Sequence, residues 1–193
     1  MITRAQVAKA AFWQLLFIAR GTSKERVRAA SEEGLMLLRG FSPEQMRELV
    51  GEALEPVLRP LVYDEPLRLV ERHRERGEPS YIVSAALQEV VEAIAVDLGF
   101  DGALGTVCEV ENGVYTGRGV RSLHGEHKAL AVRELADERG YDLAESTAYS
   151  DSHTDLPFLE AVGHPIAVNP DRALRRLATE RDWPVLRFGA RAA

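Results

Sequence analysis

Hydrophobic positions in the first third of the chain recur only at helical spacing. Ser42 and Gln45 stand at the two positions of a capping box, with a proline between them in the first turn of the helix. Pro56 then marks a joint, and no strand pattern occurs before Tyr63. The first third is therefore predicted to consist of helices, at residues 5–19, 24–39 and 43–55.

Beyond the joint, short apolar runs alternate with helical patterns. The runs predict strands at 81–83, 106–110, 114–117, 146–149, 165–168 and 184–188. The patterns between them predict helices at 64–76, 87–98, 126–139, 154–162 and 171–181. Asn112-Gly113 is a strong hairpin signal between the second and third runs. The remaining alternation predicts an α/β fold with a Rossmann-like, doubly wound parallel sheet, whose ligands lie beyond the carboxyl ends of the strands.

Composition narrows the class of protein. The chain has 193 residues, of which 46% are hydrophobic and 28% charged, as in an average globular protein. Its net charge of -6 argues against a nucleic-acid partner. The apolar run at residues 10–19 is too short to span a membrane, so no membrane partner is expected, and a targeting peptide is the weaker interpretation of this run. Cys108 has no second cysteine to pair with, which fits a reducing, cytoplasmic location.

Charge and aspartate are unevenly distributed. Residues 1–63 hold nine Lys/Arg and seven Glu, a net charge of +2, whereas residues 64–193 have a net charge of -8. All nine aspartates lie from Asp64 onward. The first third therefore contains no aspartate that could act as a nucleophile or a metal ligand.

Ser84 directly follows the first predicted strand and precedes Ala85 and Ala86. A hydroxyl group at this place, with small neighbours and free backbone amides at a helix start, suits a phosphoryl oxygen. The alternative, that Ser84 simply caps the helix at 87–98, is equally compatible with the pattern.

Two carboxylates, Asp151 and Asp155, follow the strand at 146–149 at a spacing of four. They could bind Mg²⁺ through oxygen, although spacing alone favours a helix cap and a first-turn aspartate. Asn169 and Asp171 follow the next strand and are ordinary turn and cap residues.

Lys128 lies in the first turn of a predicted helix, where its charge opposes the helix dipole. An anionic ligand or a carboxylate partner would account for this placement, and a solvated surface lysine is the alternative. His124, His127 and His153 do not have the spacing of a zinc site. Cys108, in a predicted strand, is expected to be a small buried residue rather than a nucleophile.

Taken together, these elements resemble motifs II, III and IV of the haloacid dehalogenase-like (HAD) phosphatases. Ser84 resembles motif II, Lys128 motif III, and the run from Ser150 to Pro157 motif IV. Tyr149-Ser150-Asp151-Ser152 and Ala167-Val168-Asn169-Pro170-Asp171 are similar to subfamily IB, the phosphoserine-phosphatase-like hydrolases. The resemblance covers about residues 60–190, and it implies a helical cap domain at 1–58 and a HAD core at 59–193.

The resemblance also implies roles for individual residues. Ser84, Ala85 and Lys128 would bind the phosphoryl group, Asp151 and Asp155 would serve the metal site, and Ser84, Lys128 and Asp155 would be catalytic. The implied activity is Mg²⁺-dependent hydrolysis of a small phosphorylated metabolite similar to phosphoserine. His127 before the lysine and Ala85-Ala86 after the serine depart from the family's usual residues, and either could alter the phosphate pocket.

Motif I of the family, D-x-D-x-[TV], has no counterpart in this sequence. Its first aspartate is the nucleophile that becomes an aspartyl phosphate, and it ends a strand in the middle of the family's sheet. We expect that this strand and its aspartates lie upstream of the present chain; a non-catalytic HAD-like protein that binds a phosphate or a partner is the alternative. In either case the 193-residue chain is predicted to lack metal-dependent phosphatase activity.

Overall fold

The computed structural model describes residues 34–189, which belong to two compact units. The first unit ends at Ser122 and the second spans Leu123–Gly189. The helix predicted at 5–19 and most of the one at 24–39 lie outside the described residues; residues 34–37 are helical. The predicted cap boundary at 58/59 falls within the first unit and stays a prediction.

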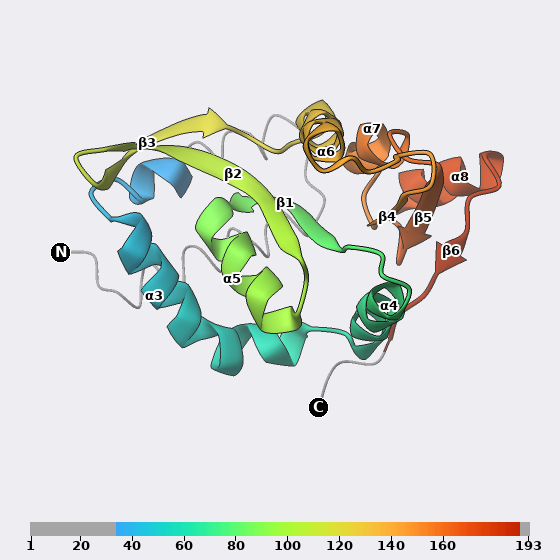
Figure 1. The fold of residues 1–193 in the computed structure, drawn as a ribbon, viewed down its shortest axis with the longest axis horizontal. Coiled ribbons are helices and arrows are strands. Elements are labelled where there is room, and N and C mark those ends of the chain that lie inside the picture. Colours follow the sequence, from blue (N-terminus) through green and yellow to red (C-terminus); the bar gives the residue numbers. More distant parts are fainter. Residues whose placement is uncertain (1–33, 190–193) are drawn as a thin grey trace. The chain divides into compact units, whose positions relative to one another are not determined.

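Two helices of the first unit precede its sheet in the chain, α3 (Pro43–Ala53) and α4 (Asp64–Glu75), both labelled in Figure 1. Ser42 caps α3, and the reciprocal bond from its amide to the Gln45 side chain, 2.9 Å long, completes the predicted capping box. The proline-rich joint is not an open linker. It forms a π-helical turn at Leu54–Leu58 and a 3-10 turn at Arg59–Leu61.

The sheet of the first unit has the order β1-β2-β3, with α5 (Gln88–Leu98) between its first two strands in the chain. β1 (Tyr81–Leu87) pairs in parallel with β2 (Gly102–Glu111), which forms an antiparallel hairpin with β3 (Val114–Arg121). Asn112 and Gly113 both have positive φ, 53° and 80°, as a two-residue hairpin turn requires. The hairpin prediction is therefore confirmed.

The core of the first unit joins α3, α5 and the hairpin, which lie together in Figure 1. Cys108 is 6% exposed in this core, and burial raises the pKa of its thiol to about 11. The predicted buried role of Cys108 is confirmed. The buried residues of this core are Leu35, Leu38, Met46, Leu49, Val50, Leu87, Val90, Cys108 and Tyr115.

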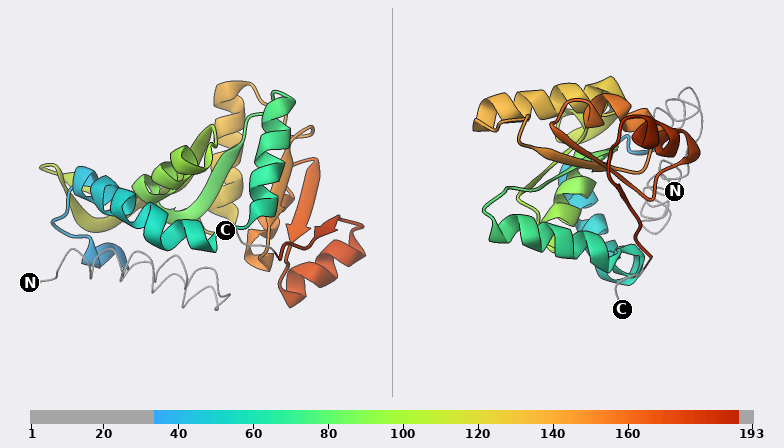
Figure 2. Two further views of the ribbon diagram at one scale, coloured as in Figure 1. Left: turned by 90° about the horizontal axis from the view of Figure 1, so that it is seen from below. Right: turned by 90° about the vertical axis from the view of Figure 1, so that its right-hand side faces the viewer.

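The second unit is built on the parallel sheet β4-β5-β6 (Figure 2). Its helices pack on one another and on this sheet, α6 against α7 and α8 against β5. A small core of Ala148, Leu159, Ala167, Leu174 and Ala178 joins the layers. The elements are α6 (Glu126–Arg139), β4 (Thr147–Ser150), a 3-10 turn (His153–Asp155), α7 (Leu156–Leu159), β5 (His164–Val168), α8 (Arg172–Glu180) and β6 (Val185–Leu186).

The end of β5 is tied to the chain beyond β6. Asn169 has a positive φ of 43°, and its side-chain amide donates to the Phe188 carbonyl at 3.0 Å and accepts from the Phe188 amide at 3.0 Å. These two bonds continue the β5–β6 ladder through a side chain. The turn predicted at Asn169 is thus also a strand-to-strand tie.

The α/β class with parallel strand pairing is confirmed for residues 34–189. These residues form two three-stranded sheets, with β1 and β4 each at the outer position of its own sheet. No strand within the described range hydrogen-bonds to both β1 and β4. No helix in this range is long and apolar enough to cross a membrane.

Candidate functional site

Lys128 and Asp155 form the centre of a polar cluster in the second unit. Lys128 Nζ donates to Asp155 Oδ2 at 2.7 Å, and Ser150 Oγ donates to the same oxygen at 2.8 Å. The Lys128 and Asp155 side chains are each only 13% exposed, and Nζ lies 6.0 Å from the centre of the Phe158 ring. A carboxylate partner therefore accounts for a lysine in the first turn of α6, one of the two explanations that the sequence left open.

The local backbone places these side chains. Gly125 precedes α6 with φ 55° and ψ -120°, a backbone conformation that residues other than glycine rarely adopt. Ser150 is the last residue of β4, and Asp155 ends the following 3-10 turn. The end of a parallel strand and the start of a helix thus bring the three polar groups together.

Asp151 lies on the exposed side of this cluster. Although it reaches the surface, partial burial raises the pKa of its carboxyl; the nearby Asp155 carboxylate adds to this rise, whereas its own backbone amide and Lys128 oppose it. Among the described residues no ion pair engages the Asp151 carboxylate. The Asp151 carboxylate is therefore available to a cation. The Asp155 carboxylate is less available, because its Oδ2 already accepts two hydrogen bonds.

The interpretation of Asp151 as a helix cap is wrong, whereas Asp155 does lie in the first turn of the short helical segment that follows β4, as the alternative interpretation expected. Ser152, not Asp151, caps the 3-10 turn, accepting from the Thr154 amide at 3.3 Å. The carboxylate of Asp155 accepts from Lys128 and Ser150 instead of a helix amide. Spacing alone favoured a cap and a first-turn aspartate because it does not reveal long-range partners such as Lys128.

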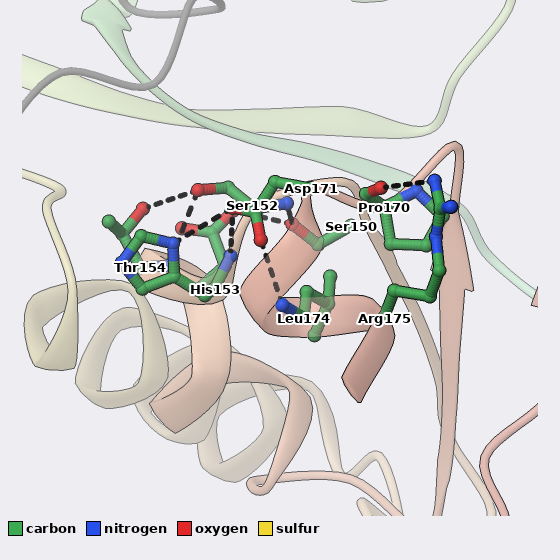
Figure 3. Close-up of polar contacts among 9 residues, drawn as sticks. Ser150, Ser152, His153, Thr154, Pro170, Asp171, Leu174 and Arg175 are labelled. Atoms are coloured by element: carbon green, nitrogen blue, oxygen red, sulfur yellow. Dashed lines mark hydrogen bonds and ion pairs between the residues drawn. The ribbon is translucent and has the colours of Figure 1, made fainter. Parts of the chain in front are cut away.

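Asp171 makes contacts that the sequence did not predict, and the environment of His124 changes the pKa of its ring. Asp171 caps α8, as expected, but also bonds to the loop that follows Asp151 (Figure 3). Burial lowers the pKa of the His124 imidazole, and the positive charge of Lys128 lowers it further. In the described part of the chain no three His, Cys, Asp or Glu side chains come together as a metal site.

Ser84 lies in the first unit, inside β1 rather than at its end. Its Oγ accepts from the Ala86 amide at 3.2 Å, while α5 begins at Gln88 with no side-chain cap. The interpretation of Ser84 as a helix cap is therefore wrong. Ala85 is buried, and its carbonyl accepts from Thr106 Oγ1 at 2.8 Å.

The strand register changes where Ser84 lies. Val83 pairs with Leu104 and Leu87 with Thr106, so that Ser84, Ala85 and Ala86 oppose Gly105 alone. A Cβ at Gly105 would lie 2.6 Å from Gln88 Cα, which explains why a glycine stands there. The predicted site residues thus fall into two groups: Ser84 and Ala85 in the first unit, and Lys128, Asp151 and Asp155 together in the second.

Comparisons with known proteins agree with these motifs. A profile of haloacid dehalogenase-like hydrolases matches residues 2–160. The "Inhibition of morphological differentiation protein" of Streptomyces azureus is 43% identical over 189 residues, which cover 97% of this chain and 68% of that protein. Phosphoserine phosphatase SerB1 of Mycobacterium tuberculosis is 39% identical over 163 residues, covering 84% of this chain and 53% of that protein.

A solved structure of substrate-bound phosphoserine phosphatase shares the fold, with a TM-score of 0.63 and 18% identity over 95% of this chain and 84% of that one. The present chain spans 68% and 53% of the two curated relatives. The match to the family profile extends over most of the chain and includes Ser84, Lys128, Asp151 and Asp155. The chain therefore belongs to the haloacid dehalogenase-like hydrolase family.

Proposed function

We propose that the chain supplies the phosphate- and metal-binding residues of a Mg²⁺-dependent phosphomonoester hydrolase. The observation that carries this proposal is the mostly buried cluster of Lys128, Asp155 and Ser150 beside the exposed residue Asp151. A fixed cation next to an accessible carboxylate can receive a phosphoryl group and a divalent ion side by side.

Lys128 is proposed to bind the phosphoryl oxygens. Its ammonium group is held at 2.7 Å by Asp155 and shielded on one side by Phe158, so it is fixed before a ligand arrives. A fixed positive charge stabilises the negative charge of the transferring group without reorganisation at the moment of reaction. Asp155 is proposed to orient Lys128, with Ser150 holding the same carboxylate oxygen.

The donor set suits Mg²⁺, which takes oxygen ligands and commonly uses one or two protein carboxylates together with water and phosphate. Asp151 would be the main protein ligand, and Asp155 Oδ1 could assist, because both bonds described above engage its Oδ2. When bound, the ion would offset negative charge on the phosphate.

Ser84 and Ala85 are proposed to bind phosphoryl oxygens, as the family resemblance implies. The substrate class is a small phosphorylated metabolite, and phosphoserine is the first candidate because a 39% identical relative is named a phosphoserine phosphatase. The cytoplasmic location expected from the sequence stays a prediction.

The sequence leaves one alternative function open. Residues 1–63 hold no aspartate, so they contain no motif I nucleophile. A HAD-like protein that binds phosphate or a partner without turnover would have the same second unit. The two functions differ in whether motif I belongs to the natural protein.

Reading the coding DNA upstream of Met1 separates them. An in-frame strand ending in D-x-D-x-[TV] supports the hydrolase, whereas a stop codon before any such motif supports the binding protein. If the motif is found, the longer protein should release phosphate from phosphoserine in the presence of Mg²⁺. Lys128→Ala should then lower kcat/KM by about 100-fold or more, and an unchanged value would contradict the role of Lys128.

A further inference from the structure

Asp171 uses its two carboxylate oxygens for two different segments (Figure 3). Oδ1 accepts from the Leu174 amide at 2.8 Å, which is the helix cap of α8. Oδ2 accepts from the His153 amide at 2.9 Å and contacts His153 Nδ1 at 2.8 Å. A helix cap needs only one oxygen, so the second oxygen calls for a separate explanation.

The backbone of Asp171 adds a third bond to the same loop. Its amide donates to the carbonyl of Asp151 at 2.8 Å. One residue of the β5–α8 loop therefore binds the chain on both sides of Ser152, at Asp151 and at His153. Both segments belong to the second unit.

The other side of this loop is also held. Ser150 Oγ accepts from the Ser152 amide at 3.3 Å and donates to Asp155. The segment from Asp151 to His153 is thus bonded to Ser150 within its own turn and to Asp171 from the next loop. Ser150 and Asp171 together fix the path of this segment.

We propose that Asp171 is a positioning residue, which fixes the loop from Asp151 to His153 so that the Asp151 carboxylate is aimed at a divalent cation. This inference rests on the metal site of the proposed function and extends it to a residue in the next loop. Groups that orient metal ligands typically change affinity by about 10- to 100-fold when they are removed.

The variant Asp171→Ser tests the bond to His153 separately from the cap of α8. Serine is as good an N-cap as aspartate, and it retains one oxygen for the Leu174 amide, but it has no second oxygen for His153. Ser42→Ala is the matched control, because it removes the cap of α3 in the first unit and leaves the second unit untouched. Asp151→Asn tests the metal ligand itself.

The test measures binding of Mn²⁺, a paramagnetic substitute for Mg²⁺, to the 193-residue chain by electron paramagnetic resonance. We expect Asp171→Ser to weaken binding about 10-fold, with a melting temperature no lower than that of Ser42→Ala, whose Mn²⁺ affinity should equal that of the wild type. If Asp151→Asn weakens binding while Asp171→Ser leaves it unchanged, the positioning role is overturned and the metal site stands.

If Asp151→Asn binds Mn²⁺ as the wild type does, the proposed metal site fails, and amide hydrogen exchange decides the remaining claim. Asp171→Ser should make the His153 amide exchange about 10-fold faster or more while the Leu174 amide stays protected. Unchanged exchange at His153 would overturn the hold of Asp171 on the loop.

Discussion

Removing either partner of the Lys128–Asp155 pair should destabilise the second unit. The two side chains are mostly enclosed, at 13% exposure each, so Lys128→Ala leaves a carboxylate with only Ser150 as donor. Loss of one partner from a fully buried pair costs about 3–5 kcal/mol, and the residual exposure here lowers our expectation to about 2–3 kcal/mol for each single variant. The double variant Lys128→Ala/Asp155→Ala should cost less than the sum of the two, by about 2 kcal/mol.

Urea unfolding followed by tryptophan fluorescence provides the assay. Trp183 packs on the core of the second unit, and Trp13 is the other tryptophan in the sequence, so a Trp13→Phe background makes the signal specific to that unit. The exposed pair Arg176–Glu180, with side chains 78% and 55% exposed, is the matched control. Its double-mutant cycle should give less than about 1 kcal/mol.

A coupling energy for Lys128 and Asp155 no larger than that of the exposed pair would refute the reasoning. It would mean that water screens both charges despite the short distance between them. Lys128 would then not be a fixed cation, and the main support for the proposed function would be lost.

Three further predictions concern other parts of the chain. Gly105→Ala should destabilise the first unit by about 2–3 kcal/mol, as measured by thermal unfolding, because its Cβ would meet backbone atoms of Gln88 that cannot move independently; a variant as stable as the wild type would contradict the close approach. Above pH 9 the first unit should lose stability, because the pKa of Cys108 is about 11 when folded and 9.0 as a free thiol, so the unfolded chain ionises first. Between pH 9 and 11 the loss should reach roughly 3 kcal/mol and should shrink in Cys108→Ala; equal pH profiles for the two proteins would argue against it. The 193-residue chain should not hydrolyse p-nitrophenyl phosphate with Mg²⁺, and turnover that Asp151→Asn abolishes would overturn this prediction.

The local elements could be predicted from sequence because their signals are local. The capping box at Ser42, the Asn112-Gly113 turn and the buried Cys108 each depend on neighbouring residues or on a strand pattern. The strand carrying Ser84 was predicted too short, because Ser84-Ala85-Ala86 looks like a helix start. Its extended backbone depends on Gly105, about twenty positions away in sequence.

For the candidate site, too, the local features could be predicted from sequence and the long-range contacts could not. The residue types at Lys128, Asp151 and Asp155 suggested phosphate and metal chemistry, but the spacing of the two aspartates alone favoured a helix cap and a first-turn aspartate. The bond from Lys128 to Asp155 joins residues 27 positions apart, and no periodicity reports such a contact. Asp171 was predicted as a cap because half of its carboxylate does cap a helix; the other half binds His153, 18 positions earlier.

The tie between Asn169 and Phe188 links the C-terminal part of the second unit to the loop that holds Asp171. Asn169 is two residues before Asp171, so freeing its side chain would loosen the backbone on which Asp171 depends. Shortening the chain to Leu186 should therefore expose the start of α8, where Arg172 and Arg175 stand, to trypsin. A fusion partner or affinity tag at this end should accordingly be joined after Gly189, so that the loop near Asp151 is not disturbed through a change made far away in the sequence.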